Sequence, residues 1–204
     1  MKLKKNEGFT LIEIITVVVV VGIVSTIAVF NLVNMLPKFR ANNSARAVAS
    51  GLQLARLKAV SENNNFIVYF YSPDNAGIYR YEILDDDDNN GQQDSDETLY
   101  TGKEYYLEPG IIFGRAKSGI QRTTCGGEID ADGLHFTGDK VTFNPAGRPN
   151  KNGSIYIIPE EDDESHDAKT SNWRAISVTT NGRIKTWIYN ATVENCGNGQ
   201  GPWK

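Results

Sequence analysis

The sequence predicts an α+β protein in which one long N-terminal helix packs on an antiparallel β-sheet. The first observation is an apolar run from Ile14 to Leu36 that contains no ionisable side chain. The second is an amphipathic pattern beyond Pro37, with apolar residues at helical spacing. The third is a series of short segments rich in β-branched and aromatic residues, separated by turn signals, in the remainder of the chain.

The apolar run is long enough to cross a membrane. About 23 residues form a helix roughly 35 Å long, and the hydrocarbon core of a bilayer is about 30 Å thick. Lys2, Lys4 and Lys5 precede the run, and such an excess of lysine keeps its end of the segment in the cytoplasm. We therefore expect a single-pass anchor with a cytoplasmic N-terminus and a periplasmic or extracellular head.

Glu13 lies near the start of this anchor. A carboxylate inside a membrane helix costs about 2.5–3.5 kcal/mol on insertion scales, so such a residue usually has a functional partner. If the chain is cut after Gly8, the new α-amino group of Phe9 is a cation at the same depth, available to Glu13 of a neighbouring copy. The alternative is an uncleaved signal anchor whose Glu13 reaches the nearby membrane interface.

The segment G-F-T-L-I-E at residues 8–13 resembles the class III signal of type IV prepilins and type II secretion pseudopilins. The resemblance implies cleavage between Gly8 and Phe9 by a prepilin peptidase, N-methylation of Phe9, and a role for Glu13 in assembly with other pilin or pseudopilin subunits. It divides the chain into a leader (1–8), a transmembrane helix in the inner membrane (9–36) and a pilin-like globular domain (37–204).

The first proline departs from the pattern of that family. Many relatives have a proline where this sequence has Phe30, and the first proline here is Pro37. Proline removes a hydrogen bond from a helix and clashes with the preceding turn. Any kink or local melting is therefore expected close to the membrane exit.

Beyond Pro37 the helix is expected to continue into the globular domain. An apolar stripe recurs at helical spacing, and Arg46, Gln53 and Arg56 fall on other faces. Three consecutive asparagines, 63–65, predict the end of the helix. The apolar stripe consists of Val48, Leu52, Ala55 and Ala59.

Eight strands are expected after the helix. The turn signal T-N-G at residues 180–182 joins the last two in a hairpin. The predicted strands are Phe66–Tyr71, Ile78–Leu84, Glu104–Leu107, Ile111–Arg115, Val141–Phe143, Ser154–Ile158, Arg174–Thr179 and Arg183–Tyr189.

Three segments of the head resemble the GspH/FimT family of minor pilins and pseudopilins. They are residues 44–61, V-T-F-N-P-A-G at 141–147 and R-A-I-S-V-T-T-N-G-R at 174–183. The resemblance implies a minor pseudopilin of a type II secretion filament, which assists assembly or tip organisation for protein export. The alternative is a minor type IV pilin that serves pilus assembly, adhesion or DNA uptake.

A possible nucleic-acid contact follows from the same family. Some FimT-like pilins bind DNA through a C-terminal G-R-x-R element, and this chain has G-R-I-K at residues 182–185. Arg183 and Lys185 are the candidate DNA contacts, although lysine lacks the bidentate geometry of arginine. The net charge of −4 becomes −6 when residues 1–8, with three lysines and one glutamate, are removed. This acidity opposes general affinity for nucleic acid, and the two cations also fit outward positions on a hairpin strand.

The acidic segment 86–97 fits the calcium-loop pattern D-x-[DN]-x-[DN]-G-x₅-E. Gly91 permits the tight turn, and oxygen ligands at this spacing suit Ca²⁺. Strands rather than helices are expected on both sides, so the loop alone matches, and a solvated acidic loop is the alternative. The expected ligands are Asp86, Asp88, Asn90, Gln92 (through its carbonyl), Asp94 and Glu97.

Cys125 and Cys196 are the only cysteines, and their separation matches no zinc or redox motif. In an oxidising compartment they are expected to form one disulfide, which would stabilise the fold by roughly 4 kcal/mol on the chain-entropy model. Two unpaired buried thiols are the alternative.

No sequence motif supports an enzyme. His135 and His166 are the only histidines, and neither lies in a metal-ligand pattern. His135 lies between Leu134 and Phe136 in a strand-like segment and is expected to be structural. The second acidic run, residues 160–167, lacks the glycine and the spacing of a cation loop and is expected to be solvated.

Overall fold

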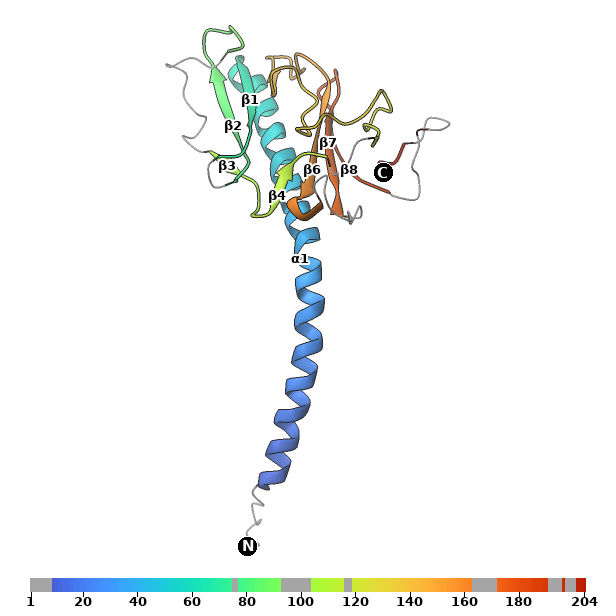
Figure 1. The fold of residues 1–204 in the computed structure, drawn as a ribbon. Helices are drawn as coiled ribbons and strands as arrows, with labels where there is room; N and C mark the ends of the chain where they lie inside the picture. The colour runs from blue at the N-terminus through green and yellow to red at the C-terminus, as the bar shows by residue number, and fades with distance from the viewer. Residues whose placement is uncertain are drawn as a thin grey trace, which may run out of the picture. The chain divides into compact units, whose positions relative to one another are not determined.

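The computed structural model describes residues 9–74, 77–92, 104–115, 119–162, 172–190, 196 and 201–204. The chain divides into two compact units, Met1–Leu36 and Pro37–Lys204. One helix, α1 (Leu11–Glu62), contributes residues to both units (Figure 1). It remains helical through Pro37, so the local melting considered at this proline does not occur.

The part of α1 in the first unit is apolar and exposed. It is long and apolar enough to cross a membrane, and side chains such as Val18 and Val24 are 64% and 60% exposed. The hydroxyls of Thr16 and Thr26 donate to the carbonyl oxygens of Ile12 and Gly22 at 2.8 and 2.9 Å. These bonds satisfy the two hydroxyls within the helix itself, as a lipid environment requires.

The part of α1 in the second unit has one buried face. Val48, Leu52, Ala55 and Ala59 are all fully buried, which confirms the predicted stripe. Small residues dominate this face because it lies close to a sheet: a Cβ on Gly51 would stand 2.6 Å from the ring of Tyr81. The helix ends at Glu62, immediately before the asparagines, and Asn63 has a positive φ of 55°.

The strands form two antiparallel four-stranded sheets. Sheet A has the order β3-β2-β1-β5, and sheet B has the order β4-β6-β7-β8. Each predicted strand overlaps one of these, with ends that differ by a few residues. Sheet A contains β1 (Asn65–Tyr71), β2 (Arg80–Asp86), β3 (Tyr105–Tyr106) and β5 (Lys140–Phe143), and sheet B contains β4 (Ile111–Phe113), β6 (Gly153–Pro159), β7 (Arg174–Val178) and β8 (Ile184–Ile188).

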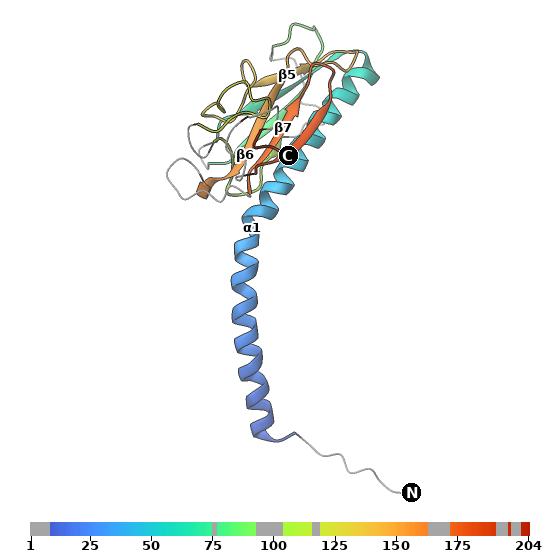
Figure 2. The same cartoon turned by 90° about the vertical axis from the view of Figure 1, so that its right-hand side faces the viewer.

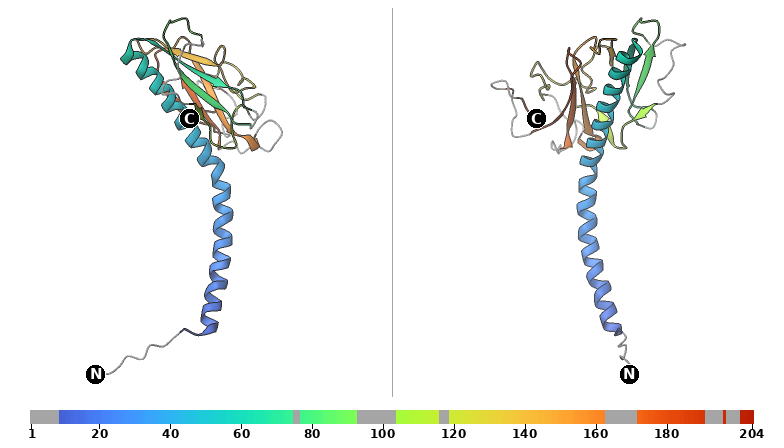
Figure 3. Two further views of the ribbon diagram at one scale, coloured as in Figure 1. Left: turned by 90° about the vertical axis from the view of Figure 1, so that its left-hand side faces the viewer. Right: turned by 180° about the vertical axis from the view of Figure 1, so that it is seen from behind.

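The main core lies between the buried face of α1 and both sheets. Figures 2 and 3 show the C-terminal part of the helix running across one side of the strands. One cluster joins Leu52 of the helix to Phe66 of sheet A and Ile176 of sheet B. A single helix thus holds the two sheets in one unit, because both bury apolar side chains against it.

A second core covers the other face of sheet B. Tyr156 of β6 and Ala175 of β7 pack there with Ile120, Ile129 and Trp203. β6 and β7 are therefore buried at every residue. A loop that follows β4 and a segment near the C-terminus cover this face. Because both faces of β6 and β7 are covered, buried and exposed residues do not alternate along these strands.

Candidate functional site

The N-terminal motif forms a capped helix start. α1 begins at Leu11, and the hydroxyl oxygen of Thr10 accepts a hydrogen bond from the N–H of Glu13 at 3.3 Å. Thr10 is therefore the N-cap, and Glu13 lies in the first turn, where the helix dipole favours a negative charge. The Glu13 side chain is exposed. Gly8 lies outside the described residues, so cleavage at Gly8–Phe9 and methylation of Phe9 stay predictions.

Two motif glycines bring the head segments together against α1. Gly147 follows β5 and Gly182 lies in the turn between β7 and β8, with φ angles of 69° and 74°. A Cβ on Gly182 would lie 2.2 Å from the Gly147 carbonyl oxygen, and the Nε–H of Arg56 donates to that same oxygen at 2.9 Å. The segments 141–147 and 174–183 therefore meet at one point on the helix, where a larger residue than glycine would clash.

The β7–β8 hairpin carries both candidate DNA contacts. Its turn has a 2.7 Å hydrogen bond from the N–H of Gly182 to the carbonyl of Thr179, which confirms the predicted turn. Arg183 and Lys185 are exposed. The ammonium of Lys185 lies 3.3 Å from the centre of the Trp187 ring, so its charge lies against an aromatic face.

In the first half of the acidic loop, backbone N–H groups donate to the loop's own acidic and asparagine side chains. Asp86 is fully buried at the end of β2, and its carboxylate accepts from the N–H of Gly91 at 3.1 Å. Asp88 accepts from the N–H of Asn90 at 3.0 Å, and the Asn90 side-chain oxygen accepts from the N–H of Gln92. The predicted ligands Asp94 and Glu97 lie outside the described residues. Within the part of the chain that the structure describes, no group of three acidic, histidine or cysteine side chains is placed to hold a metal ion.

Several carboxylates and one lysine lie close together around this loop. Burial raises the pKa of Asp85, and the carboxylates of Asp87, Glu62 and Asp86 raise this pKa further, against a hydrogen bond from Asn64 that lowers it. Lys140 provides a nearby cation: its ammonium donates to the Gly91 carbonyl and to the Tyr69 hydroxyl. The loop therefore already has one protein cation at its base.

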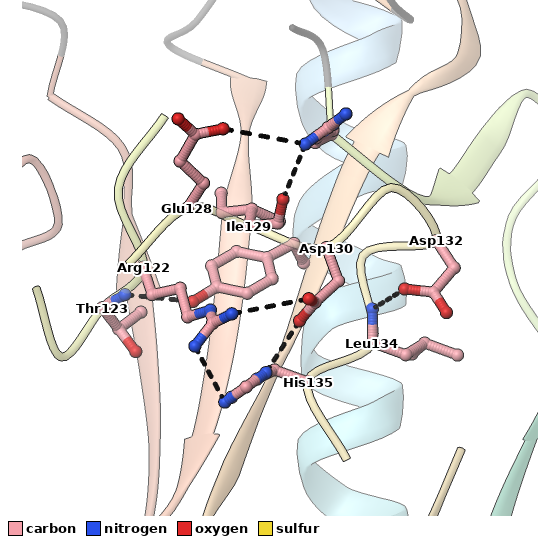
Figure 4. A network of polar contacts seen from close by, with 10 residues as sticks. Arg122, Thr123, Glu128, Ile129, Asp130, Asp132, Leu134 and His135 are labelled. Atoms are coloured by element: carbon pink, nitrogen blue, oxygen red, sulfur yellow. Dashed lines mark hydrogen bonds and ion pairs between the residues drawn. The ribbon is translucent and has the colours of Figure 1, made fainter. Parts of the chain in front are cut away.

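The disulfide joins a surface loop to the C-terminal segment. The Cys125 and Cys196 sulfurs are 2.06 Å apart, in agreement with the predicted pairing. The loop that carries Cys125 is fixed to β6 by two contacts of Thr123. Its N–H donates to the Tyr156 hydroxyl at 3.0 Å (Figure 4), and its own hydroxyl contacts that of Ser154 at 2.8 Å. This loop covers the second core.

A polar network that the sequence did not predict lies beside this loop (Figure 4). The Nδ1 of His135 is 2.7 Å from a carboxylate oxygen of Asp130, and its Nε2 is 3.1 Å from Nη1 of Arg122. A guanidinium only donates, so Nε2 accepts, and the ring proton lies on Nδ1 and is donated to Asp130. Such a histidine holds the loop in place, and the structural role expected for His135 fits these contacts.

The network has the carboxylate–histidine pair of a catalytic triad. Arg122, instead of a serine or cysteine, contacts the second ring nitrogen. A pocket of about 470 Å³ adjoins it, lined among others by Asp132, Asp139 and Lys151. No spacing pattern links Arg122, Asp130 and His135 in the sequence. The Thr10 cap was also not predicted, although the T-x-x-E spacing at residues 10–13 is a signal that could have predicted it.

Two family models match this chain. The model of the prokaryotic N-terminal methylation motif matches residues 3–29. The model described as type II transport protein GspH matches residues 44–182, more than half of the chain. The chain belongs to the GspH family. Within this GspH-family chain, the match contains Arg56, Gly147 and Gly182, the three residues that meet at the helix, and ends before Arg183.

Solved structures of two minor subunits are similar to this GspH-family chain. The type IV minor pilin FimU of Pseudomonas aeruginosa is 14% identical, with a TM-score of 0.42 over 71% of this chain and 85% of that chain. The minor pseudopilin EpsH of the type 2 secretion system of Vibrio cholerae is 15% identical, with a TM-score of 0.41 over 73% and 97%. No curated protein matches the sequence. The family assignment rests on the GspH model.

Proposed function

We propose that this chain is a minor pseudopilin subunit of a type II secretion filament, which assists assembly or tip organisation for protein export. It is cut after Gly8 by a prepilin peptidase and N-methylated on Phe9. Residues 9–36 anchor it in the inner membrane, with the N-terminus cytoplasmic before processing and the head periplasmic. The observation that carries the proposal is the GspH match over the head, joined to a methylation motif over the helix start.

The exposed first part of α1 supports assembly with other subunits. Its exposed apolar side chains require lipid or the helices of neighbouring subunits, because contact of this much apolar surface with water is unfavourable. Thr10 caps the helix through its own hydroxyl and leaves the Glu13 carboxylate exposed. In lipid that carboxylate needs a cationic partner, and the α-amino group of Phe9 from a neighbouring copy is the proposed one.

A secretion assay tests this function. In cells that lack the gene, we expect a secreted enzyme to accumulate in the periplasm, and the wild-type chain restores its export. The Glu13→Ala variant should fail to do so while being made and cut normally. Glu62→Ala is the matched control, since Glu62 ends the same helix and forms a surface ion pair with Lys58. Normal secretion in the deleted strain contradicts the proposal.

The second candidate is a minor type IV pilin for pilus assembly, adhesion or DNA uptake. The exposed cations Arg183 and Lys185 are the observation that favours it. The same deleted strain decides between the two, since loss of surface pili with normal secretion supports the pilin. Transformation efficiency of an Arg183→Ala strain then tests the DNA-uptake form of this candidate.

We further propose that the loop 86–97 binds Ca²⁺ as a structural ion. The described half supports it, because Gly91 is in the left-handed region (φ 71°) and its N–H bonds back to Asp86, which closes the turn. Burial, and after it the neighbouring carboxylates, raise the pKa of Asp85, and a cation here would offset the repulsion among these carboxylates. The competing explanation is that Lys140 alone supplies the positive charge.

Thermal unfolding with and without Ca²⁺ tests the loop. Calcium at about a hundred times its Kd stabilises by about 2.7 kcal/mol, which raises the Tm by about 5–10 °C in a chain of this size. Asp88→Asn should remove most of this rise, whereas Asp87→Asn, at a position between ligands, should keep it. An unchanged Tm on adding Ca²⁺ to the wild-type chain leaves Lys140 as the only cation of the loop.

A further inference from the structure

Strand β8 forms one edge of sheet B, and its backbone groups alternate between the sheet and the open side. The N–H and C=O of Ile188 bond to Lys204 at 2.8 and 2.9 Å, away from β7. The C=O of Arg183 instead accepts from Thr179 on the β7 side. Antiparallel pairing alternates in this way at every residue, so the N–H and C=O of Ile184 and Thr186 point to the open edge.

A short piece of added strand already occupies one end of this edge. Tyr189 and Trp203 form an antiparallel bridge, next to the pair of bonds between Ile188 and Lys204. This end of the edge thus already accepts an additional strand. In the part of the chain that the structure describes, no backbone group pairs with the outward side of Ile184 or Thr186.

The side chains around the open stretch are apolar on one face and cationic on the other. Ile184 packs partly on the main core, and Thr186 on the same face is exposed. Lys185 points to the opposite face, where it stands over Trp187. The hairpin from residue 174 to residue 188 contains no carboxylate, and its two exposed cations are Arg183 and Lys185, in a chain with a net charge of −4. Its third cation, Arg174, is buried and bonds to Asn42.

We propose that the open edge of β8, at Ile184 to Thr186, binds an extended acidic segment of a partner protein by strand addition. Backbone hydrogen bonds to Ile184 and Thr186 supply affinity, and the alternation of the strand supplies specificity. The fitting segment alternates apolar residues, which meet Ile184, with acidic residues, which meet Lys185 and Arg183. This inference does not depend on the proposed role in secretion.

The test uses the full chain in detergent micelles and a fluorescent peptide of alternating valine and glutamate with blocked ends. We expect saturable binding and slower amide hydrogen exchange at Ile184 and Thr186. Thr186→Pro removes only the outward N–H, because the N–H of Thr186 does not bond to β7, and should weaken binding about tenfold, the effect of one or two lost hydrogen bonds. Lys185→Glu should also weaken binding, whereas Lys151→Glu, an exposed lysine on another turn, should not.

Three results would overturn the proposal. A peptide with lysine in place of glutamate that binds equally well excludes charge recognition. Duplex DNA that binds in place of the peptide, and is lost with Lys185→Glu, assigns the cations to nucleic acid. Self-association that protects the same amides without peptide assigns the edge to a second copy. The exchange measurement also serves as the check that the Thr186→Pro chain is folded, and Lys185→Glu gives a second variant if it is not.

Discussion

The two parts of α1 differ in what surrounds them, although one helix runs through both. From Leu11 to Leu36 most side chains are large and aliphatic, and those described are exposed. From Ala41 to Ala59 the buried face is mostly small residues, with Leu52 and Val48 as the larger members. Apolar character alone therefore does not place a helix. The first part lacks a polar face and requires lipid or other subunits, whereas the second fits one particular sheet surface.

Truncation of a leucine should show the largest difference in stability between the two parts of the helix. Leu52→Ala is expected to destabilise the head by about 3 kcal/mol, because the side chain is fully buried and leaves a cavity. Leu32→Ala, at a side chain that is 64% exposed, should leave head unfolding unchanged. Denaturant unfolding of the full chain in micelles measures both. Equal losses in the two variants would mean that the parts unfold as one.

The glycines of the helix provide a second matched pair. Gly51→Ala should cost about 1–3 kcal/mol, because its Cβ would stand 2.6 Å from Tyr81 and the ring must move. Gly22→Ala has nothing within 4 Å, so it should leave the head unaffected. Thermal unfolding followed by near-ultraviolet circular dichroism, which reports on tyrosine packing, would detect the difference. An unchanged Gly51→Ala signal would show that the helix sits farther from β2.

The hydroxyl of Tyr81 should contribute a smaller, pH-dependent effect. It donates to the Ala47 carbonyl at 2.9 Å, and burial raises the pKa of Tyr81. Tyr81→Phe should cost about 1 kcal/mol at neutral pH. A raised pKa means that the folded state favours the neutral phenol. The contribution of Tyr81 to the free energy of unfolding is therefore fully present below the unfolded pKa of about 10 and falls at higher pH. Between about pH 9 and pH 11, a range around the unfolded pKa of tyrosine, the variant should therefore lose less stability than the wild type.

The exposed end of the helix should show the smallest effect. Glu62→Ala removes an ion pair with Lys58 at 2.7 Å on the surface. We expect a loss of about 0.3–0.5 kcal/mol that disappears in high salt. Unfolding at low and high ionic strength measures it. A loss well above this range would indicate that Glu62 also matters to the crowded carboxylates near Asp85.

Much of the fold was predictable, because local rules and tertiary contacts agree. The helical stripe, the asparagine stop and the T-N-G hairpin all appear where the sequence placed them. The division into two sheets was not readable, since strand order depends on contacts between distant segments such as β4 with β6. The first half of the acidic loop lies at the end of β2 as expected, but its bonds to Lys140 depend on a residue far along the chain.

The contacts of the long loop were the least predictable. Arg122, Asp130 and His135 carry no periodic pattern, and each contact depends on how the loop settles on β6. The motif segments around Gly147 and Gly182 were recognisable by resemblance. Their physical reason, a backbone approach that a Cβ would block, required the structure. The cap at Thr10 was not among the predictions, although the T-x-x-E spacing is a sequence signal that could have predicted it.

The disulfide between Cys125 and Cys196 closes a covalent ring, with a separation of 71 residues, that contains β5, β6, β7 and β8. A single protease cut inside this ring leaves the two fragments attached to each other. Such a nicked chain runs close to full length on a non-reducing gel and separates into two bands only after reduction. The ring therefore keeps the C-terminal strands tied to the anchored part of the protein even after the backbone has been broken.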